Sequence, residues 1–158
     1  VALGSNIGEP RENLDLAIAL LREATEVVAV SSYYQTKPVG FLDQPDFLNA
    51  VCLIESDLPA LDLLKMLHGI EKAMGRERLI QWGPRTIDLD LIDFEKSILK
   101  TEKLELPHPR AFERCFVLKP WLEIDSNAEI LNKGSISELI KNLNCEDMKL
   151  FPKKLLNL

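Results

Sequence analysis

The segment at residues 82–90, Trp-Gly-Pro-Arg-Thr-Ile-Asp-Leu-Asp, constrains this chain most, because it predicts a stiff turn followed by a β-strand with two acidic residues. Successive side chains of a strand point to opposite faces, so Asp88 and Asp90 would share one face and their apolar neighbours the other. Two adjacent carboxylates repel each other unless a cation lies between them. With Arg85 just upstream, the pattern favours a complex of Mg²⁺ and phosphate, although an isolated Asp-x-Asp strand is more often a solvated face.

Composition limits the classes of protein to consider. With 158 residues, 46% of them hydrophobic and 28% charged, the chain fits one soluble domain at residues 1–158. The net charge of −6 argues against broad binding of nucleic acid or membrane surfaces. No apolar run has the length of a membrane span and no secretory leader is visible, which predicts a cytoplasmic protein. The three cysteines lack metal-like spacing, so reduced thiols are expected. The chain begins at Val1 rather than methionine, so we expect a shortened first strand.

Hydrophobic periodicity predicts the element order β-α-β-β-α-β. Apolar residues recur at helical spacing after Pro10 and again after Pro59, and both prolines suit a first helical turn. β-Branched, aromatic and alternating residues predict strands at 1–3, 27–34, 47–55 and 86–94. This order is typical of an α+β ferredoxin-like sandwich, in which two helices cover one face of an antiparallel sheet. The other face would be left for a ligand or for further elements.

The C-terminal part is expected to add a strand and helices to this sandwich. Residues 97–106 predict a strand, and residues 115–123 a short helix that Pro120 interrupts. Ser135 and Glu138 form a capping-box pattern for a last helix that ends at Leu143.

Positive charge is concentrated just before the acidic strand. Arg76, Arg78 and Arg85 lie in a short span, and such a loop could close over a polyphosphate. Trp82 would then act as a lid that packs down on closure, or else fill the core. Taken alone, a loop of this kind is more often a solvated arginine-rich segment.

His108 lies between two prolines, which stiffen its backbone. Its imidazole could donate to a phosphoryl oxygen or carry a proton, and Arg114 could reach the same anion. Without the rest of the pattern, each would more often be an ordinary surface residue.

Phe47 and Asn49 would share one strand face and together suit a flat heterocycle. The ring offers a stacking plane and the amide offers a donor and an acceptor. Phe116 could supply the opposite plane, although buried phenylalanines are more often core residues. The loop at 36–45, with two prolines and a glycine, is long enough to be functional.

Five motifs follow one another in a characteristic order: Leu-Gly-Ser-Asn at 3–6, Gln-Pro-Asp-Phe-Leu-Asn-Ala at 44–50, Gly-Arg-x-Arg at 75–78, the segment 82–90, and Leu-Pro-His-Pro at 106–109 through Arg114, Phe116 and Val117. Together they resemble the 6-hydroxymethyl-7,8-dihydropterin pyrophosphokinase family of folate biosynthesis. The resemblance covers residues 1–124, and Arg-Thr-Ile-Asp-Leu-Asp is its most specific part. It implies transfer of a pyrophosphoryl group from ATP to the hydroxymethyl oxygen of the pterin, leaving AMP.

The resemblance also implies roles for single residues. Asp88 and Asp90 would be the ligands of two Mg²⁺ ions that bridge the triphosphate, and Arg76 and Arg85 would complete the catalytic set. The residues that would contact ATP are Arg76, Arg78, Trp82, Lys103, His108 and Arg114. The residues that would hold the pterin are Thr36, Val39, Gly40, Phe47, Asn49 and Phe116.

Three positions depart from the family pattern. The linker at 75–82 is one residue shorter than in a bacterial relative, Phe47 stands where tyrosine is common, and Lys103 stands where an arginine sometimes contacts the nucleotide. All three departures leave the two acidic residues in place.

Two alternative functions remain at this stage. One is another Mg²⁺-dependent phosphoryl or nucleotidyl transferase on the same fold, which pterin binding would exclude. The other is a catalytically silent nucleotide-binding domain, which release of AMP would exclude. Small molecules are the expected partners, and the chain could belong to a longer multifunctional protein of the folate pathway.

Overall fold

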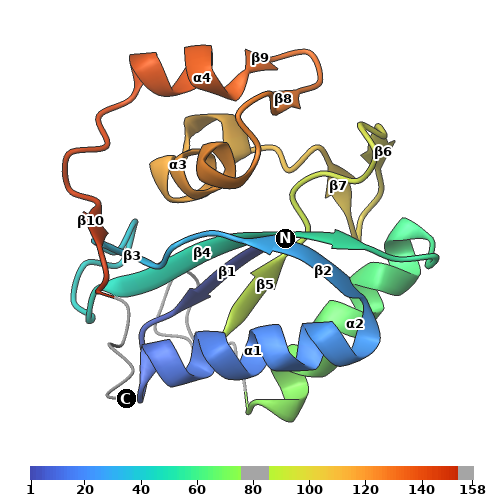
Figure 1. Ribbon diagram of the computed structural model, residues 1–158, viewed down its shortest axis with the longest axis horizontal. Coiled ribbons are helices and arrows are strands. Elements are labelled where there is room, and N and C mark those ends of the chain that lie inside the picture. Colours follow the sequence, from blue (N-terminus) through green and yellow to red (C-terminus); the bar gives the residue numbers. More distant parts are fainter. Residues whose placement is uncertain (76–85, 153–158) are drawn as a thin grey trace.

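An antiparallel sheet separates two layers of helices in this chain (Figure 1). The computed structural model describes residues 1–75 and 86–152. The fold is therefore α+β, as predicted. The strands of the main sheet are β1 Ala2–Ser5, β2 Glu26–Val30, β3 Tyr34–Thr36, β4 Phe47–Glu55, β5 Asp88–Asp90 and β10 Lys149–Leu150. Their order is β10-β3-β4-β1-β5, and β2 pairs with the other half of the long β4.

The lower layer in Figure 1 consists of α1 (Pro10–Ala24) and α2 (Ala60–Ala73), which begin where the sequence predicts. Each helix buries one apolar stripe, as amphipathic helices do. The core that they form with the sheet includes Leu14, Ala17, Leu21, Leu63 and Leu67 from the helices and Leu3, Leu48, Ala50 and Leu89 from the strands.

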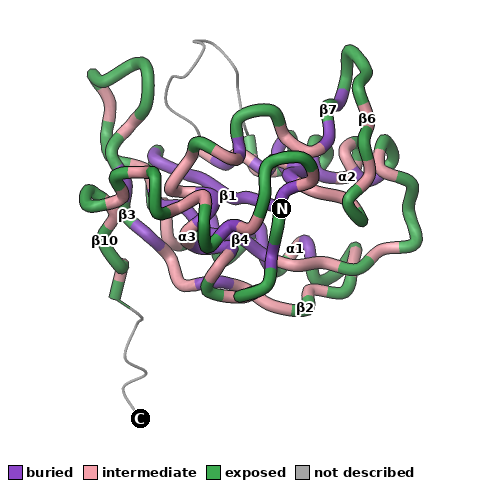
Figure 2. Tube along the Cα trace, turned by 90° about the horizontal axis from the view of Figure 1, so that it is seen from above, coloured by how far each residue is buried: buried purple, intermediate pink, exposed green. Residues whose placement is uncertain are grey.

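The upper layer consists of α3 (Cys115–Ile124) and α4 (Ile136–Leu139), which is continued by a 3₁₀ turn at Ile140–Asn142. A second core joins this layer to the sheet and includes Ala2, Val51, Val117, Leu118 and Trp121. Part of the sheet face predicted to be left open is thus covered by further elements. Figure 2 shows buried stretches running along β1 and β4.

Side chains along the strands alternate between these two cores. In and beside β5, Ile87, Leu89 and Leu91 are buried toward α1 and α2, whereas Asp88 and Asp90 are only half-buried and point the other way. On β4, Val51 belongs to the core with α3, while Ala50 and Cys52 belong to the core with α1 and α2. The predicted division of faces is therefore confirmed on both strands.

The predicted strand at 27–34 was wrong in its continuity, because it is divided into β2 and β3. The Ser31 hydroxyl accepts a hydrogen bond from the Val51 amide at 2.9 Å, which interrupts the regular ladder. A register shift between Val27 and Ala29 bends the chain further. The first strand also differs from its prediction, since β1 continues through Ser5.

Two later strands are shorter than predicted. β5 covers only the stretch that pairs with Ala2, Leu3 and Gly4 of β1, and not all of 86–94. Residues 97–106 form a hairpin of β6 (Leu99–Lys100) and β7 (Glu105–Leu106) rather than one strand. Thr101 closes this hairpin, because its hydroxyl both donates to and accepts from the backbone of Leu104.

Pro120 lies inside α3 and does not interrupt it, contrary to the prediction. A proline removes one helical hydrogen bond, but Pro120 and its neighbours Leu118 and Trp121 are buried in the second core. Packing of this apolar face therefore outweighs the lost bond.

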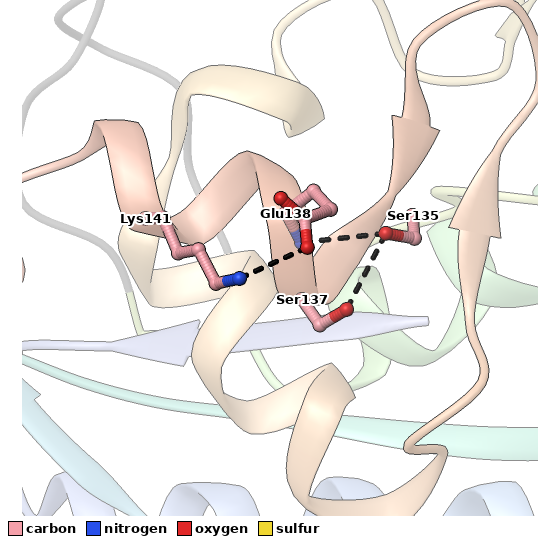
Figure 3. Close-up of polar contacts among 4 residues, drawn as sticks. All are labelled: Ser135, Ser137, Glu138 and Lys141. Carbon is pink, nitrogen blue, oxygen red and sulfur yellow. Dashed lines mark hydrogen bonds and ion pairs between the residues drawn. The ribbon is translucent and has the colours of Figure 1, made fainter.

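The predicted cap of the last helix is confirmed. The Ser135 hydroxyl accepts a hydrogen bond from the Glu138 amide at 3.3 Å, and the Glu138 carboxylate accepts one from Lys141 at 2.9 Å (Figure 3). Ser137 lies 3.3 Å from the Ser135 hydroxyl. The helix is shorter than predicted, since the stretch before Leu143 is a 3₁₀ turn.

The prediction of three reduced thiols is wrong. Cys115, at the start of α3, forms a disulfide with Cys145, and only Cys52 is free and buried. The two bonded cysteines are 30 residues apart in the sequence. Their spacing therefore gave no sign of a pair. Within residues 1–75 and 86–152, no helix is long and apolar enough to cross a membrane.

Candidate active site

The centre of the site is a row of paired residues across three strands. Gly4 on β1 pairs with Asn49 on β4 on one side and with Asp88 on β5 on the other. Directly opposed residues of antiparallel strands point to the same face, here the face that carries α3. Asn49 and Asp88 therefore flank a position that has no side chain.

Gly4 is needed for this arrangement. A Cβ atom at Gly4 would lie 2.9 Å from Oδ1 of Asn49 and 3.8 Å from Cδ1 of Phe47. The first distance is closer than such atoms can approach without a shift. Sequence reasoning treated Gly4 only as part of a turn, although a glycine inside a strand often marks a close approach of other groups.

The acidic pair, Asp88 and Asp90, lies beside small residues of β1. Asp90 pairs with Ala2, as Asp88 pairs with Gly4, so neither carboxylate has a bulky cross-strand neighbour on β1. Between them, the Leu89 amide donates to Oε2 of Glu71 on α2 at 3.3 Å, which fixes the position of β5. The carboxylates therefore lie beside small side chains on β1, on a strand whose backbone is fixed to α2.

Three of the residues predicted to bind a pterin line one cavity of about 520 Å³, namely Thr36, Val39 and Phe116. Asn49 contacts one of these lining residues, since its Nδ2 donates to the Thr36 hydroxyl at 2.5 Å. Both residues are buried, with exposed fractions of 7% and 6%. Phe47 pairs across the strands with Thr36.

Gly40 follows Val39 in the loop after β3 and adopts a φ of +85°, a conformation that favours glycine. The same loop is fastened to the end of β1 by Asn6. Nδ2 of Asn6 donates to Oε1 of Gln44 and to the carbonyl of Pro45, both at 2.9 Å. This anchoring role of Asn6 was missed by the sequence interpretation, which treated it as a turn residue.

His108 follows the cis bond between Leu106 and Pro107, and its backbone amide donates to the Ile92 carbonyl at 2.8 Å. Nδ1 of His108 accepts from the Arg110 amide at 3.2 Å, so the neutral ring carries its hydrogen on Nε2. Burial lowers the pKa of His108, Arg114 lowers it further, and Asp88 opposes the shift. The neutral ring is therefore favoured, with Nε2 as a donor.

Arg114 is the residue that precedes α3, and its guanidinium lies 5.4 Å from the ring centroid of Phe116. Burial lowers the pKa of Arg114, while the charges of Asp90 and Asp88 oppose this. Arg114 thus belongs both to the neighbourhood of the acidic pair and to the lining of the cavity. The structure brings two residues predicted to bind phosphate, His108 and Arg114, toward the predicted acids.

Other predicted site residues cannot be placed in the same way. Arg76, Arg78, Trp82 and Arg85 lie outside the described residues. Lys103 is exposed in the turn between β6 and β7. Their assigned roles remain predictions.

The acidic pair suits a metal that is shared with a ligand. In the described part of the chain, no three His, Cys, Asp or Glu residues come together as a metal site. Mg²⁺ is commonly held by one or two carboxylates, with substrate phosphates and water completing an octahedron. Two carboxylates on one face of a strand match that donor set better than a site built entirely from protein ligands.

Comparison with known proteins identifies the family. The sequence profile of the 7,8-dihydro-6-hydroxymethylpterin-pyrophosphokinase (HPPK) family matches residues 1–126. The 2-amino-4-hydroxy-6-hydroxymethyldihydropteridine pyrophosphokinase of Bacillus subtilis (strain 168) is 47% identical over 131 residues, which are 82% of this chain and 78% of that protein. The protein of the same name from Haemophilus influenzae (strain ATCC 51907 / DSM 11121 / KW20 / Rd) is 43% identical over 143 residues, 89% of each chain.

Some relatives are longer than this chain. The bifunctional protein FolKE of Lactococcus lactis subsp. cremoris (strain MG1363) is 43% identical over 129 residues, which make up 80% of this chain and 37% of that protein. The match with the family profile covers most of the sequence, from β1 through α3, and includes every described residue that the sequence predicted for the site. The chain belongs to the 7,8-dihydro-6-hydroxymethylpterin-pyrophosphokinase family.

Proposed function

We propose that this chain transfers a pyrophosphoryl group from ATP to the hydroxymethyl oxygen of 6-hydroxymethyl-7,8-dihydropterin, giving AMP and the pterin diphosphate. Family membership and the names of its relatives support this reaction in folate biosynthesis. The structural observation that carries it is the row Asn49–Gly4–Asp88, because this row joins a heterocycle pocket to an acidic pair.

The pterin is bound in the cavity beside β4. Asn49 is held by Thr36, so its amide oxygen is fixed for reading the polar edge of a flat ring. Phe47 and Phe116 supply apolar planes on either side, and Val39 and Gly40 belong to the loop that borders the cavity. Ordering these groups before the ligand arrives reduces the entropy lost on binding.

The triphosphate of ATP is bound next to that cavity. His108 donates from Nε2 to a phosphoryl oxygen, and Arg114 binds phosphate through its planar guanidinium. Asp88 and Asp90 would hold Mg²⁺ shared with the phosphates, and Arg76 and Arg85 would complete the catalytic set. When bound, Mg²⁺ neutralises charge on the phosphates and helps to align the attacking and leaving oxygens.

The protein therefore contributes position and electrostatics more than covalent chemistry. Asp88 is not assigned as a general base, since a carboxylate bound to Mg²⁺ is a poor proton acceptor. The proposed role of Asp88 is to position Mg²⁺ near the pterin hydroxyl.

We also assign the fold to the ferredoxin-like class. Support comes from the order β3-β4-β1-β5 in the sheet and from α1 and α2 on a single face. The divided β2 and β3 act as one strand that bends along β4, and α3 and α4 are additions on the opposite face.

The test is to incubate the protein with ATP, Mg²⁺ and the pterin alcohol and to separate the nucleotide products. We expect AMP in a one-to-one ratio with the pterin diphosphate, and no AMP when the pterin is left out. Formation of ADP would exclude pyrophosphoryl transfer. Binding of ATP without release of AMP would instead support the silent nucleotide-binding alternative.

A further inference from the structure

The cavity assigned to the pterin has a wall that lies beyond the region matched by the family profile. The family profile ends at residue 126, yet Asn144, Cys145 and Met148 line the cavity together with Thr36, Val39 and Phe116. We call residues 144–150 the C-terminal wall.

Three contacts hold the C-terminal wall against the elements that border the cavity. The disulfide joins Cys145 to Cys115, with a Cα–Cα distance of 5.6 Å. At the far end of the wall, β10 pairs with β3, so that Leu150 lies opposite Tyr34. Between these points, Nζ of Lys37 lies 3.7 Å from Oδ1 of Asp147.

These contacts are not equal in strength. Lys37 and Asp147 are both largely exposed, so their ion pair contributes little and is screened by salt. The strand β10 has only two residues. The disulfide is the one covalent contact, and it attaches the wall directly beside Phe116, whose ring lines the cavity.

We propose that the C-terminal wall is the third side of the pterin site and that the Cys115–Cys145 disulfide holds it there. The oxidised protein then binds the pterin more tightly than the reduced protein, with Met148 as the apolar side chain that contacts the ligand. This inference rests on the proposed function, because it takes the cavity to be the pterin site.

The physical reason is conformational entropy. Without the disulfide, the described contacts that hold residues 144–148 are the exposed ion pair and the pairing at the far end, where β10 and the Phe151 amide bond β3 and the Tyr33 carbonyl, so pterin binding would have to order the residues between. Cys115 and Cys145 are half-buried rather than sealed, so a dithiol reductant can reach them. The reductant's two thiols become a disulfide while two electrons and two protons pass to the protein sulfurs, giving two cysteine thiols.

The experiment measures pterin binding by calorimetry with a saturating non-hydrolysable ATP analogue and Mg²⁺. Oxidised and dithiol-reduced protein are compared, and the number of thiols counted after denaturation should rise from one to three on reduction. We expect the reduced protein to bind the pterin roughly three- to tenfold more weakly. Affinity for the ATP analogue alone should be unchanged.

Variants separate the wall from the disulfide. The double variant Cys115→Ser/Cys145→Ser should bind the pterin like the reduced protein and be insensitive to reductant. Met148→Ala should weaken pterin binding in the oxidised protein. Glu146→Ala, in the same segment but exposed and outside the cavity lining, is the matched control and should bind normally.

Equal pterin affinity of the oxidised, reduced and double-serine proteins would overturn this inference while leaving the proposed function intact. If oxidised protein binds the ATP analogue but no form binds the pterin, the proposed function fails, and this inference fails with it. AMP formation by the oxidised protein distinguishes the two cases.

Discussion

Gly4 is the residue on which the geometry of the site depends. In an alanine variant the new Cβ would lie 2.9 Å from Oδ1 of Asn49, so the amide would have to move. That movement would disturb the hydrogen bond from Nδ2 of Asn49 to the Thr36 hydroxyl. We expect Gly4→Ala to weaken pterin binding at least about tenfold and to cost about 1–3 kcal/mol of unfolding free energy from overpacking. Calorimetry and urea unfolding measure the two effects.

Gly69→Ala is the matched control for this variant. A Cβ at Gly69 meets nothing within 4 Å, and the residue lies inside α2. Alanine is favoured over glycine in a helix by about 1 kcal/mol, so this variant should be stable and should bind normally. Normal pterin binding by Gly4→Ala would contradict the role given to Gly4.

The acidic pair is expected to matter for turnover rather than for folding. Asp88→Asn or Asp90→Asn should reduce AMP formation by orders of magnitude while the near-ultraviolet circular dichroism stays native, since loss of one carboxylate relieves repulsion. Asp93→Asn is the control, because burial raises the pKa of Asp93 and a neutral amide should be tolerated there. Full activity of either pair variant would end the metal assignment.

At the scale of elements, Glu123 connects α3 to the strand that borders the cavity. Its Oε1 accepts from the Tyr34 hydroxyl at 2.6 Å and its Oε2 from the Ser32 amide at 2.7 Å. Burial raises the pKa of Tyr34, and Glu123 raises it further. The neutral phenol is thus favoured in the folded state.

A loss of stability at high pH follows from this link. Because the folded-state pKa of Tyr34 lies above the unfolded value of about 10, its contribution is complete below pH 10 and is lost as the pH rises further. At pH 8, Tyr34→Phe should lower the free energy of unfolding by about 0.5–1.5 kcal/mol. Between pH 8 and pH 10.5, the variant should lose less stability than the wild type, because it has no phenol to ionise. Urea unfolding at both values tests this. If the unfolding free energies of Tyr34→Phe and the wild type depended on pH in the same way, this prediction would be contradicted. Tyr33→Phe should be measured alongside, because the pKa of Tyr33 is also raised.

At the scale of the whole molecule, both cores stabilise the fold, but only the core around α3 also positions residues of the site. Leu67 lies in the core beneath the sheet and Leu118 in the core that supports α3, and both are fully buried. Leu→Ala at either position should cost about 2–5 kcal/mol. Only Leu118→Ala should also raise the KM for the pterin at a temperature where both variants remain folded, because α3 carries Arg114 and Phe116 to the site. An equal KM in the two variants would contradict this division.

Local patterns were sufficient for the elements whose structure is local. The apolar spacing after Pro10 and Pro59 predicted α1 and α2, and alternation predicted the two faces of β4 and β5. The division of the second strand was not predictable in this way, because it depends on Ser31 meeting an amide of β4. Continuation of α3 through Pro120 likewise depends on packing against distant residues.

The sequence predicted individual site residues but not how they are arranged relative to one another. Sequence motifs indicated Asp88, Asn49 and Phe116, yet only strand pairing brings the first two together around Gly4. The contribution of the C-terminal wall was missed, because two-residue β10 has no periodicity of its own and the disulfide bridges distant positions. Contacts of this kind arise from tertiary structure alone.

Because Cys52 is free and fully buried, the rate at which its thiol is labelled can report opening of the protein interior. Its sulfur sits in the middle of β4 with an exposed fraction of 0%, while the other two cysteines are joined to each other. In the disulfide-bonded form, a thiol-specific alkylating reagent can therefore react only with Cys52, and only when the interior opens. The speed of that labelling, with and without nucleotide and pterin, would report how strongly each ligand closes the molecule, with no added dye or tag.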